Sequence, residues 1–215
     1  TLVTLAVDVT GSVQDFEDQL RELIVMSVEA CKKSPHRDNL LLRVITFSSR
    51  FDRGVEEIHG FKLLNEIDVA NYPQLYAGGY TPLCDALYSS IGAMNKFGEE
   101  LSARNYGVNG ICIAVTDGAE NDSIATRAMV REETAKSITG ETLESMITIL
   151  VGVNATQYKT VLEAFRKEVD ITQYLDAGEA TPGKIAKLAA FVSQSVSSQA
   201  QAHGTGGPSQ NIAAT

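Results

Sequence analysis

Short apolar runs alternate along the chain with segments of helical periodicity. Continuous apolar runs predict buried strands, and apolar spacings of three and four residues predict amphipathic helices. In the first such helix, Phe16, Leu20 and Ile24 share one face. The strands are expected at residues 2–7, 40–47, 51–58, 110–116, 146–153 and 171–175, and the longer helices at 13–33, from 82 onwards, 124–139, 155–168 and 182–198.

This alternation predicts an α/β fold with a doubly wound, mostly parallel six-stranded sheet and helices on both faces. The strand at 51–58 follows its predecessor after a very short turn, so we expect it to be a short antiparallel edge strand. Residues 1–200 have the length of one domain. Residues 201–215 are rich in Gln, Ala, Gly and Ser without periodicity, which predicts a flexible C-terminal tail.

Composition and charge argue against a nucleic-acid-binding, membrane-spanning or disulfide-rich protein. The 215 residues are 44% hydrophobic and carry a net charge of −9, and no run of Lys or Arg exceeds two residues. A nucleic-acid partner is therefore not expected. No apolar run approaches the ~20 residues of a membrane span. The three cysteines form no C-x-x-C pair, which argues against a disulfide framework and favours a reducing compartment.

Candidate chemistry lies in three loops that follow or precede these elements. They are residues 8–12 (Asp-Val-Thr-Gly-Ser), 78–82 (Gly-Gly-Tyr-Thr-Pro) and 116–118 (Thr-Asp-Gly). Taken alone, each segment is typical of a helix cap or a β-turn. Together they supply carboxylate and hydroxyl oxygens without sulfur or imidazole, a donor set that suits Mg²⁺ or Mn²⁺ better than zinc.

The three loops resemble the metal-ion-dependent adhesion site (MIDAS) of the von Willebrand factor A (vWA) domain family. The matching positions, in the family's order, are Asp8, Thr10, Ser12, Thr81 and Asp117, with Thr10 where the family usually has Ser. The resemblance implies that the three hydroxyls contact the ion and that the two acids hold it mainly through waters. Neutral hydroxyl ligands would leave the cation electrophilic, so it would capture a Glu or Asp carboxylate of a protein partner.

Two residues beside these loops are candidates for partner contacts. Tyr80 precedes Thr81 and belongs to a group of three tyrosines, and exposed aromatic residues are frequent at interfaces. The alternative is that one or two of these tyrosines pack against the sheet. Glu120 follows Asp117 and, like Asp122, is expected either to tune the metal or select a partner, or to be a solvated loop acid.

An enzyme of the haloacid-dehalogenase type is the alternative from another class. Residues 8–12 are similar to the phosphorylated segment of P-type ATPases, which would make Asp8 a nucleophile. However, Val9 replaces the lysine of that segment, and Thr10 replaces the acid/base Asp of the related phosphatases. The Gly-rich loop at 78–82 has no role in that scheme. The three histidines, expected at the surface or in the tail, lie outside the site loops, so we predict a binding module and not an enzyme.

The cellular setting follows only indirectly. The vWA family includes secreted adhesion proteins and intracellular factors that work beside AAA+ ATPases. The cysteine pattern favours a cytoplasmic, prokaryotic setting with an AAA+-associated complex as a candidate partner. A secreted or surface-exposed protein is the alternative. A third alternative, a structural domain that has lost its metal, finds no support because all five ligand positions keep competent oxygens.

Overall fold

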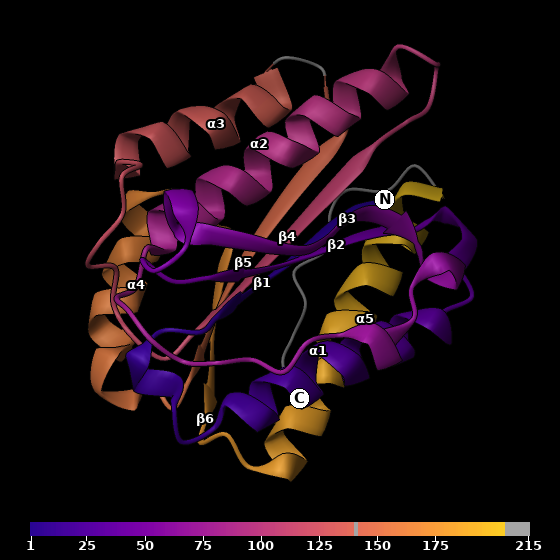
Figure 1. Ribbon diagram of the computed structural model, residues 1–215. Coiled ribbons are helices and arrows are strands. Elements are labelled where there is room, and N and C mark those ends of the chain that lie inside the picture. Colours follow the sequence, from indigo (N-terminus) through magenta and orange to yellow (C-terminus); the bar gives the residue numbers. More distant parts are fainter. Residues whose placement is uncertain (140–141, 205–215) are drawn as a thin grey trace.

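A computed structural model of the protein describes residues 1–139 and 142–204. Its centre is a six-stranded sheet in the order β3-β2-β1-β4-β5-β6 (Figure 1). All pairs are parallel except β2 with β3, so the prediction of a mostly parallel sheet with one antiparallel edge strand is confirmed. The strands are β1 (Leu2–Asp8), β2 (Leu41–Phe47), β3 (Val55–Leu63), β4 (Asn109–Thr116), β5 (Ser145–Val153) and β6 (Gln173–Gly178).

Helices cover both faces of the sheet and enclose two cores. On one face lie α1 (Glu17–Lys32) and α5 (Pro182–Gly204), and on the other α2 (Leu83–Ser102), α3 (Arg127–Thr139) and α4 (Lys159–Glu168) (Figure 1). Alternate residues of β1 pack into the two cores. Val3, Leu5 and Val7 face α1 and α5, and Leu2 and Ala6 face the helices on the other side. Short 3₁₀ turns occur at Gly11–Val13, Arg37–Asn39, Asp52–Gly54, Leu64–Glu66, Val69–Asn71 and Thr156–Tyr158. No helix in the described part of the chain is long and apolar enough to cross a membrane.

Several element boundaries differ from the predicted ones. The first helix begins at Glu17 and not near residue 13, because residues 9–16 form a loop and a 3₁₀ turn around the Asp8 carboxylate. The edge strand covers Val55–Leu63, because the preceding turn contains Arg53 and Gly54 at positive φ, which a strand cannot accommodate. The last helix continues to Gly204, so residues 201–204 of the predicted tail are helical; residues 205–215 lie outside the described residues.

The order of strands places a switch point between β1 and β4. From β1 the chain passes through α1 on one face, whereas the chain leaving β4 reaches α3 on the other face. The two strands are hydrogen-bonded neighbours with Val7 opposite Val115. The loops at their carboxyl ends therefore diverge, and ligands of doubly wound sheets usually bind outside the strand ends at such a switch point.

Candidate metal centre

Asp8 ends β1 and is a fully buried acid. Its Oδ1 accepts the backbone N–H of Thr10 at 2.8 Å, and its Oδ2 accepts the hydroxyl of Thr116 at 2.6 Å. Thr116 ends the neighbouring strand β4, so the bond joins the two strand ends at the switch point. The carboxylate is thus held in one orientation by two donors from different loops.

Ser12 links the loop after β1 to the loop after β4. Its hydroxyl donates to Asp117 Oδ1 at 2.7 Å and lies 3.1 Å from the hydroxyl oxygen of Thr10. The side chains of Thr10, Ser12 and Asp117 therefore form a continuous chain of oxygens. Residues more than a hundred positions apart meet here, as the predicted site requires.

Thr81 reaches the same edge through backbone contacts between loops. The N–H of Gly11 donates to Gly79 O at 3.0 Å, which ties the loop of residues 78–81 to the loop after β1. The Thr81 N–H donates to Asn121 Oδ1 at 2.7 Å, and Asn121 N–H donates back to Thr81 O at 3.1 Å. The buried Thr81 hydroxyl lies 3.7 Å from the position that a Cβ on Gly118 would take. All five predicted positions thus lie at one edge of the sheet.

Burial raises the pKa of both acids at the candidate site, Asp8 and Asp117. Desolvation raises the pKa of Asp8 to about 6, although the hydrogen bonds from Thr116 and Thr10 oppose the shift; the charge of Asp117 adds to it. Burial also raises the pKa of Asp117, against the hydrogen bond from Ser12. Among the described residues neither carboxylate has an ion-pair partner. A buried, unpaired carboxylate is costly, and a cation would relieve that cost.

The donor set matches a hard cation only when hydroxyls are counted. No three His, Cys, Asp or Glu side chains in the described ranges form a cluster that could hold a metal. Two acids and three hydroxyls converge instead. Oxygen ligands of this kind suit Mg²⁺ and related ions, which keep several waters and need few charged ligands.

The two predicted partner contacts occupy different environments. Tyr80 is 67% exposed and Tyr76 is 66% exposed, so both offer aromatic surface beside Thr81. The Glu120 carboxylate accepts bonds from the N–H of Cys84 and from the N–H and hydroxyl of Ser123. Glu120 therefore caps the N-terminus of α2 and holds its own loop in place, and its role toward a partner stays a prediction.

Four residues that support the site were not singled out as site residues from the sequence. They are Thr116, Asn121, Ser48 and Ser49, which orient Asp8 or fix the loop that carries Thr81. Thr116 and Asn121 lie within or beside the Thr-Asp-Gly segment, and that proximity was the available signal. The two serines follow β2, and Ser48 was considered only as a phosphate contact of the enzyme alternative, because the contacts of both serines with a loop thirty residues away leave no local pattern.

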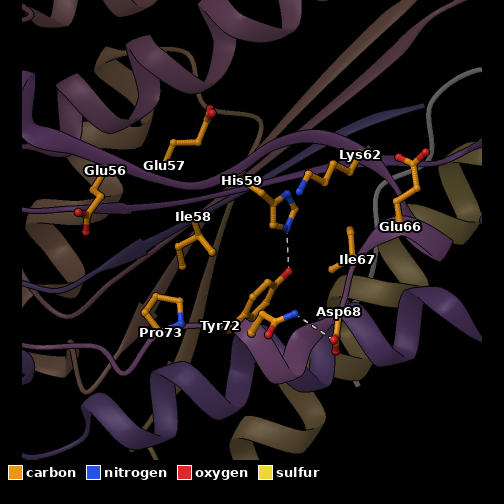
Figure 2. A pocket seen from close by; sticks show the side chains of 11 residues that line it. Glu56, Glu57, Ile58, His59, Lys62, Glu66, Ile67, Asp68, Tyr72 and Pro73 are labelled. Atoms are coloured by element: carbon orange, nitrogen blue, oxygen red, sulfur yellow. Dashed lines mark hydrogen bonds between the residues drawn. The ribbon is translucent and has the colours of Figure 1, made fainter.

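A separate cavity of about 380 Å³ lies beside the edge strand β3 (Figure 2). His59 Nε2 and the Tyr72 hydroxyl are 2.7 Å apart within it, and His59 Nδ1 lies 2.8 Å from Gly60 O. Burial lowers the pKa of His59 and raises that of Tyr72, so it favours the neutral form of both side chains. The expectation that His59 lies at the surface is therefore wrong, and Tyr72 is the one member of the tyrosine group that packs inside.

Comparisons with known proteins support the architecture. The fold is von Willebrand factor A-like. The chain is similar to the pilus adhesin SpaC from Lactobacillus rhamnosus GG in its open conformation, with a TM-score of 0.66 at 12% identity over 92% of this chain and 30% of SpaC. It is also similar to proximal thread matrix protein 1 from the mussel byssus, with a TM-score of 0.55 at 16% identity over 88% of this chain and 46% of that protein.

A second structure of the mussel protein is described as having a zinc-occupied MIDAS motif; it aligns with a TM-score of 0.55 at 14% identity over 90% of this chain and 44% of that one. This chain therefore spans less than half the length of either protein. Neither a family model nor a curated protein matches the sequence. At these identities the likeness shows the fold, and the function has to be argued from the site.

Proposed function

We propose that this chain is a protein-binding module that captures a carboxylate of its partner through a divalent cation. The observation that carries the proposal is the meeting of Asp8, Thr10, Ser12, Thr81 and Asp117 at the carboxyl edge of the sheet. Asp8 is buried there, and no Lys, Arg or His side chain in the described part of the chain pairs with it. The adhesin and the MIDAS-bearing matrix protein among the structural neighbours support the same reading.

Hydroxyl and carboxylate side chains of this chain would have different roles in holding a cation. The hydroxyls of Thr10, Ser12 and Thr81 would be ligands, and the carboxylates of Asp8 and Asp117 would accept hydrogen bonds around them. When bound, the cation would supply an electrophilic position for one more anionic oxygen, since the neutral hydroxyls offset little of its charge. The all-oxygen donor set favours Mg²⁺ or Mn²⁺. Because the mussel protein holds zinc, competition between Mg²⁺, Mn²⁺ and Zn²⁺ should be measured directly.

Removal of the Thr81 hydroxyl tests this proposal with little disturbance of packing. Thr81→Val keeps the shape of the side chain and removes one oxygen donor. We expect Mg²⁺ and Mn²⁺ binding, measured by calorimetry, to weaken by at least about tenfold, because even residues that only orient a metal ligand usually contribute that much. A pull-down from lysate should then show partners retained by the wild type in Mg²⁺ and lost with EDTA and with Thr81→Val.

The control is Asp122→Ala, which removes an exposed acid close to Asp117. It should leave metal binding within about twofold, because an exposed charge contributes little. Unchanged metal affinity in Thr81→Val, or equal loss in both variants, would contradict the assignment of the site.

Metal affinity should depend on pH. The pKa of Asp8 in the metal-free protein is raised to about 6, and the cation must displace that proton. Affinity is therefore expected to be level above pH 7 and to fall by about tenfold between pH 7.5 and pH 5. Titration of Mn²⁺ by calorimetry in two buffers of different ionisation enthalpy would measure both the loss and the protons released. A flat profile down to pH 5 would show that Asp8 does not titrate with the metal.

The buried position of Asp8 also favours binding over nucleophilic catalysis. Both of its oxygens accept hydrogen bonds and the side chain is fully buried, whereas a phosphoryl acceptor must reach its substrate. Thr81 also has a place in the cation site and none in the phosphoryl-transfer scheme. The protein should therefore release no phosphate from general phosphatase substrates.

The partner and the setting remain proposals. An acidic side chain of a protein is the ligand that the site chemistry fits, and an AAA+-associated complex in the cytoplasm is one context for it. Because the chain spans 30% of SpaC and 46% of the mussel protein, the activity of any longer protein that contains it is likewise a proposal.

A further inference from the structure

The loop after β2 lies directly against the loop that carries Thr81. The Ser49 N–H donates to Tyr80 O at 3.1 Å, and the Tyr80 N–H donates back to Ser49 Oγ at 2.9 Å. The Ser48 hydroxyl donates to Gly78 O at 2.5 Å. The next residue along, Arg50, therefore stands at the rim of the candidate metal centre.

Arg50 is positioned by its surroundings although it is exposed. Its guanidinium carbon lies 4.8 Å from the centre of the Phe51 ring, a cation–π contact. Its Nη1 lies 3.5 Å from the position that a Cβ on Gly78 would take, so the guanidinium also lies against the backbone of the Thr81 loop. A planar guanidinium held in this way presents its remaining N–H groups as a fork that fits a carboxylate.

The charge of Arg50 is also uncompensated. Most arginines of the described chain pair with acids, as Arg43 does with Glu57 and Arg127 with Glu168, or bind carbonyls. Within residues 1–139 and 142–204, no acid lies within ion-pair distance of Arg50, Arg53 or Arg104. Two of these three share the loop beside the metal centre, where Asp52 lies between them in sequence without pairing with either.

We propose that Arg50 is a second anchor for the partner, which pairs with a carboxylate next to the one captured at the metal centre. The partner would then be a segment with two acids close together. A protein of net charge −9 repels acidic partners at long range, and a local cation beside the site offsets that repulsion and fixes the orientation of the ligand. This inference rests on the proposed function and adds the class of ligand to it.

Synthetic peptides test the inference without knowledge of the natural partner. The probes are capped octapeptides of Gly and Ser that carry either one Glu or two Glu separated by one to three residues. Binding to the wild type is followed by ¹⁵N NMR in Mg²⁺ and in EDTA, including the arginine Nε–H signals. In Mg²⁺ at least one two-acid peptide should bind about three- to tenfold more tightly than the one-acid peptide, and the Arg50 signal should move with it.

Arg53→Gln is the matched control for Arg50→Gln, because both variants remove one exposed positive charge from the same loop. Arg50→Gln should abolish the preference for two acids and leave the metal-dependent binding of the one-acid peptide intact. Arg53→Gln should keep the preference. A preference for two-acid peptides that survives Arg50→Gln, or that both variants reduce equally, would contradict the role of Arg50 as an anchor. It would not contradict the proposed function. Absence of any Mg²⁺-dependent peptide binding in the wild type would count against both.

Discussion

Asp8→Asn is expected to stabilise the metal-free protein at neutral pH and to abolish its response to Mg²⁺. A pKa raised from 3.8 to about 6 means that the folded, metal-free protein holds this proton more tightly than the unfolded chain does. The ionised carboxylate therefore destabilises the fold by up to about 3 kcal/mol. This destabilisation is absent below pH 3.8, grows as the pH rises towards 6, and is complete above it.

Asn can keep both hydrogen bonds that hold Asp8. Its Oδ1 can accept the Thr10 N–H, and its Nδ2 can donate to the Thr116 hydroxyl, which has Gly118 O as its own acceptor at 3.1 Å. We expect a gain of about 2 kcal/mol in the free energy of unfolding at pH 7 in EDTA, because the substitution removes a buried, unpaired charge. The gain should vanish near pH 4.

Urea unfolding at pH 4, 5.5 and 7, in EDTA and in Mg²⁺, measures both effects. The wild type should gain about 2.7 kcal/mol when Mg²⁺ is a hundredfold above its dissociation constant, and Asp8→Asn should gain nothing. Asp122→Asn changes the net charge equally at an exposed position and should behave as the wild type. A destabilised Asp8→Asn protein at pH 7 in EDTA would mean that the carboxylate contributes more to the fold than its burial costs.

The architecture was predictable from the sequence because continuous apolar runs indicate buried strands. Strands β1, β4 and β5, buried almost throughout, are continuous apolar segments that only a sheet covered on both faces can accommodate. The site residues were predictable on a different basis. Each loop alone is typical of a cap or a turn, so their residues were named through the resemblance to the adhesion site, and parallel strands bring the ends that carry Asp8 and Asp117 to one edge.

What the sequence did not reveal depends on contacts between distant loops. Asn121 fixes Thr81, and Ser48 fixes Gly78, through single hydrogen bonds whose partners no local pattern identifies. Helix α1 begins later than predicted for the same reason, because the Thr10 N–H donates to the Asp8 carboxylate and takes no part in a helix. The His59–Tyr72 pair escaped notice because a lone histidine in an edge strand carries no signature of burial.

Gly79→Ala is expected to destabilise the protein and to remove its metal site together. Gly79 has a φ of +76°, a conformation that costs a residue with a side chain about 1–2 kcal/mol. An added Cβ would also lie 2.6 Å from Ser48 Oγ and 3.2 Å from Arg50 N. Ser48 cannot turn away freely, because its hydroxyl donates to Gly78 O and accepts the Arg50 N–H at 3.3 Å.

The loop must therefore shift, and the bond from Gly11 N–H to Gly79 O, which aligns Thr81 with the loop after β1, is lost. We expect a loss of about 2–4 kcal/mol in the free energy of unfolding and the disappearance of stabilisation by Mg²⁺. Thermal unfolding in EDTA and in Mg²⁺ measures both, with a drop of roughly 5–15 °C in Tm.

Gly78→Ala is the matched control, since its φ is not positive and its nearest neighbour would be Arg50 Nη1 at 3.5 Å, an ordinary van der Waals distance. It should stay within about 1 kcal/mol of the wild type and keep its response to Mg²⁺. Adding Ser48→Ala to Gly79→Ala removes the closest contact but not the strain at φ, so the double variant should recover only part of the loss. Full stability and normal Mg²⁺ binding in Gly79→Ala would show that the approach of these loops does not position Thr81, and the geometry of the site would have to be reconsidered.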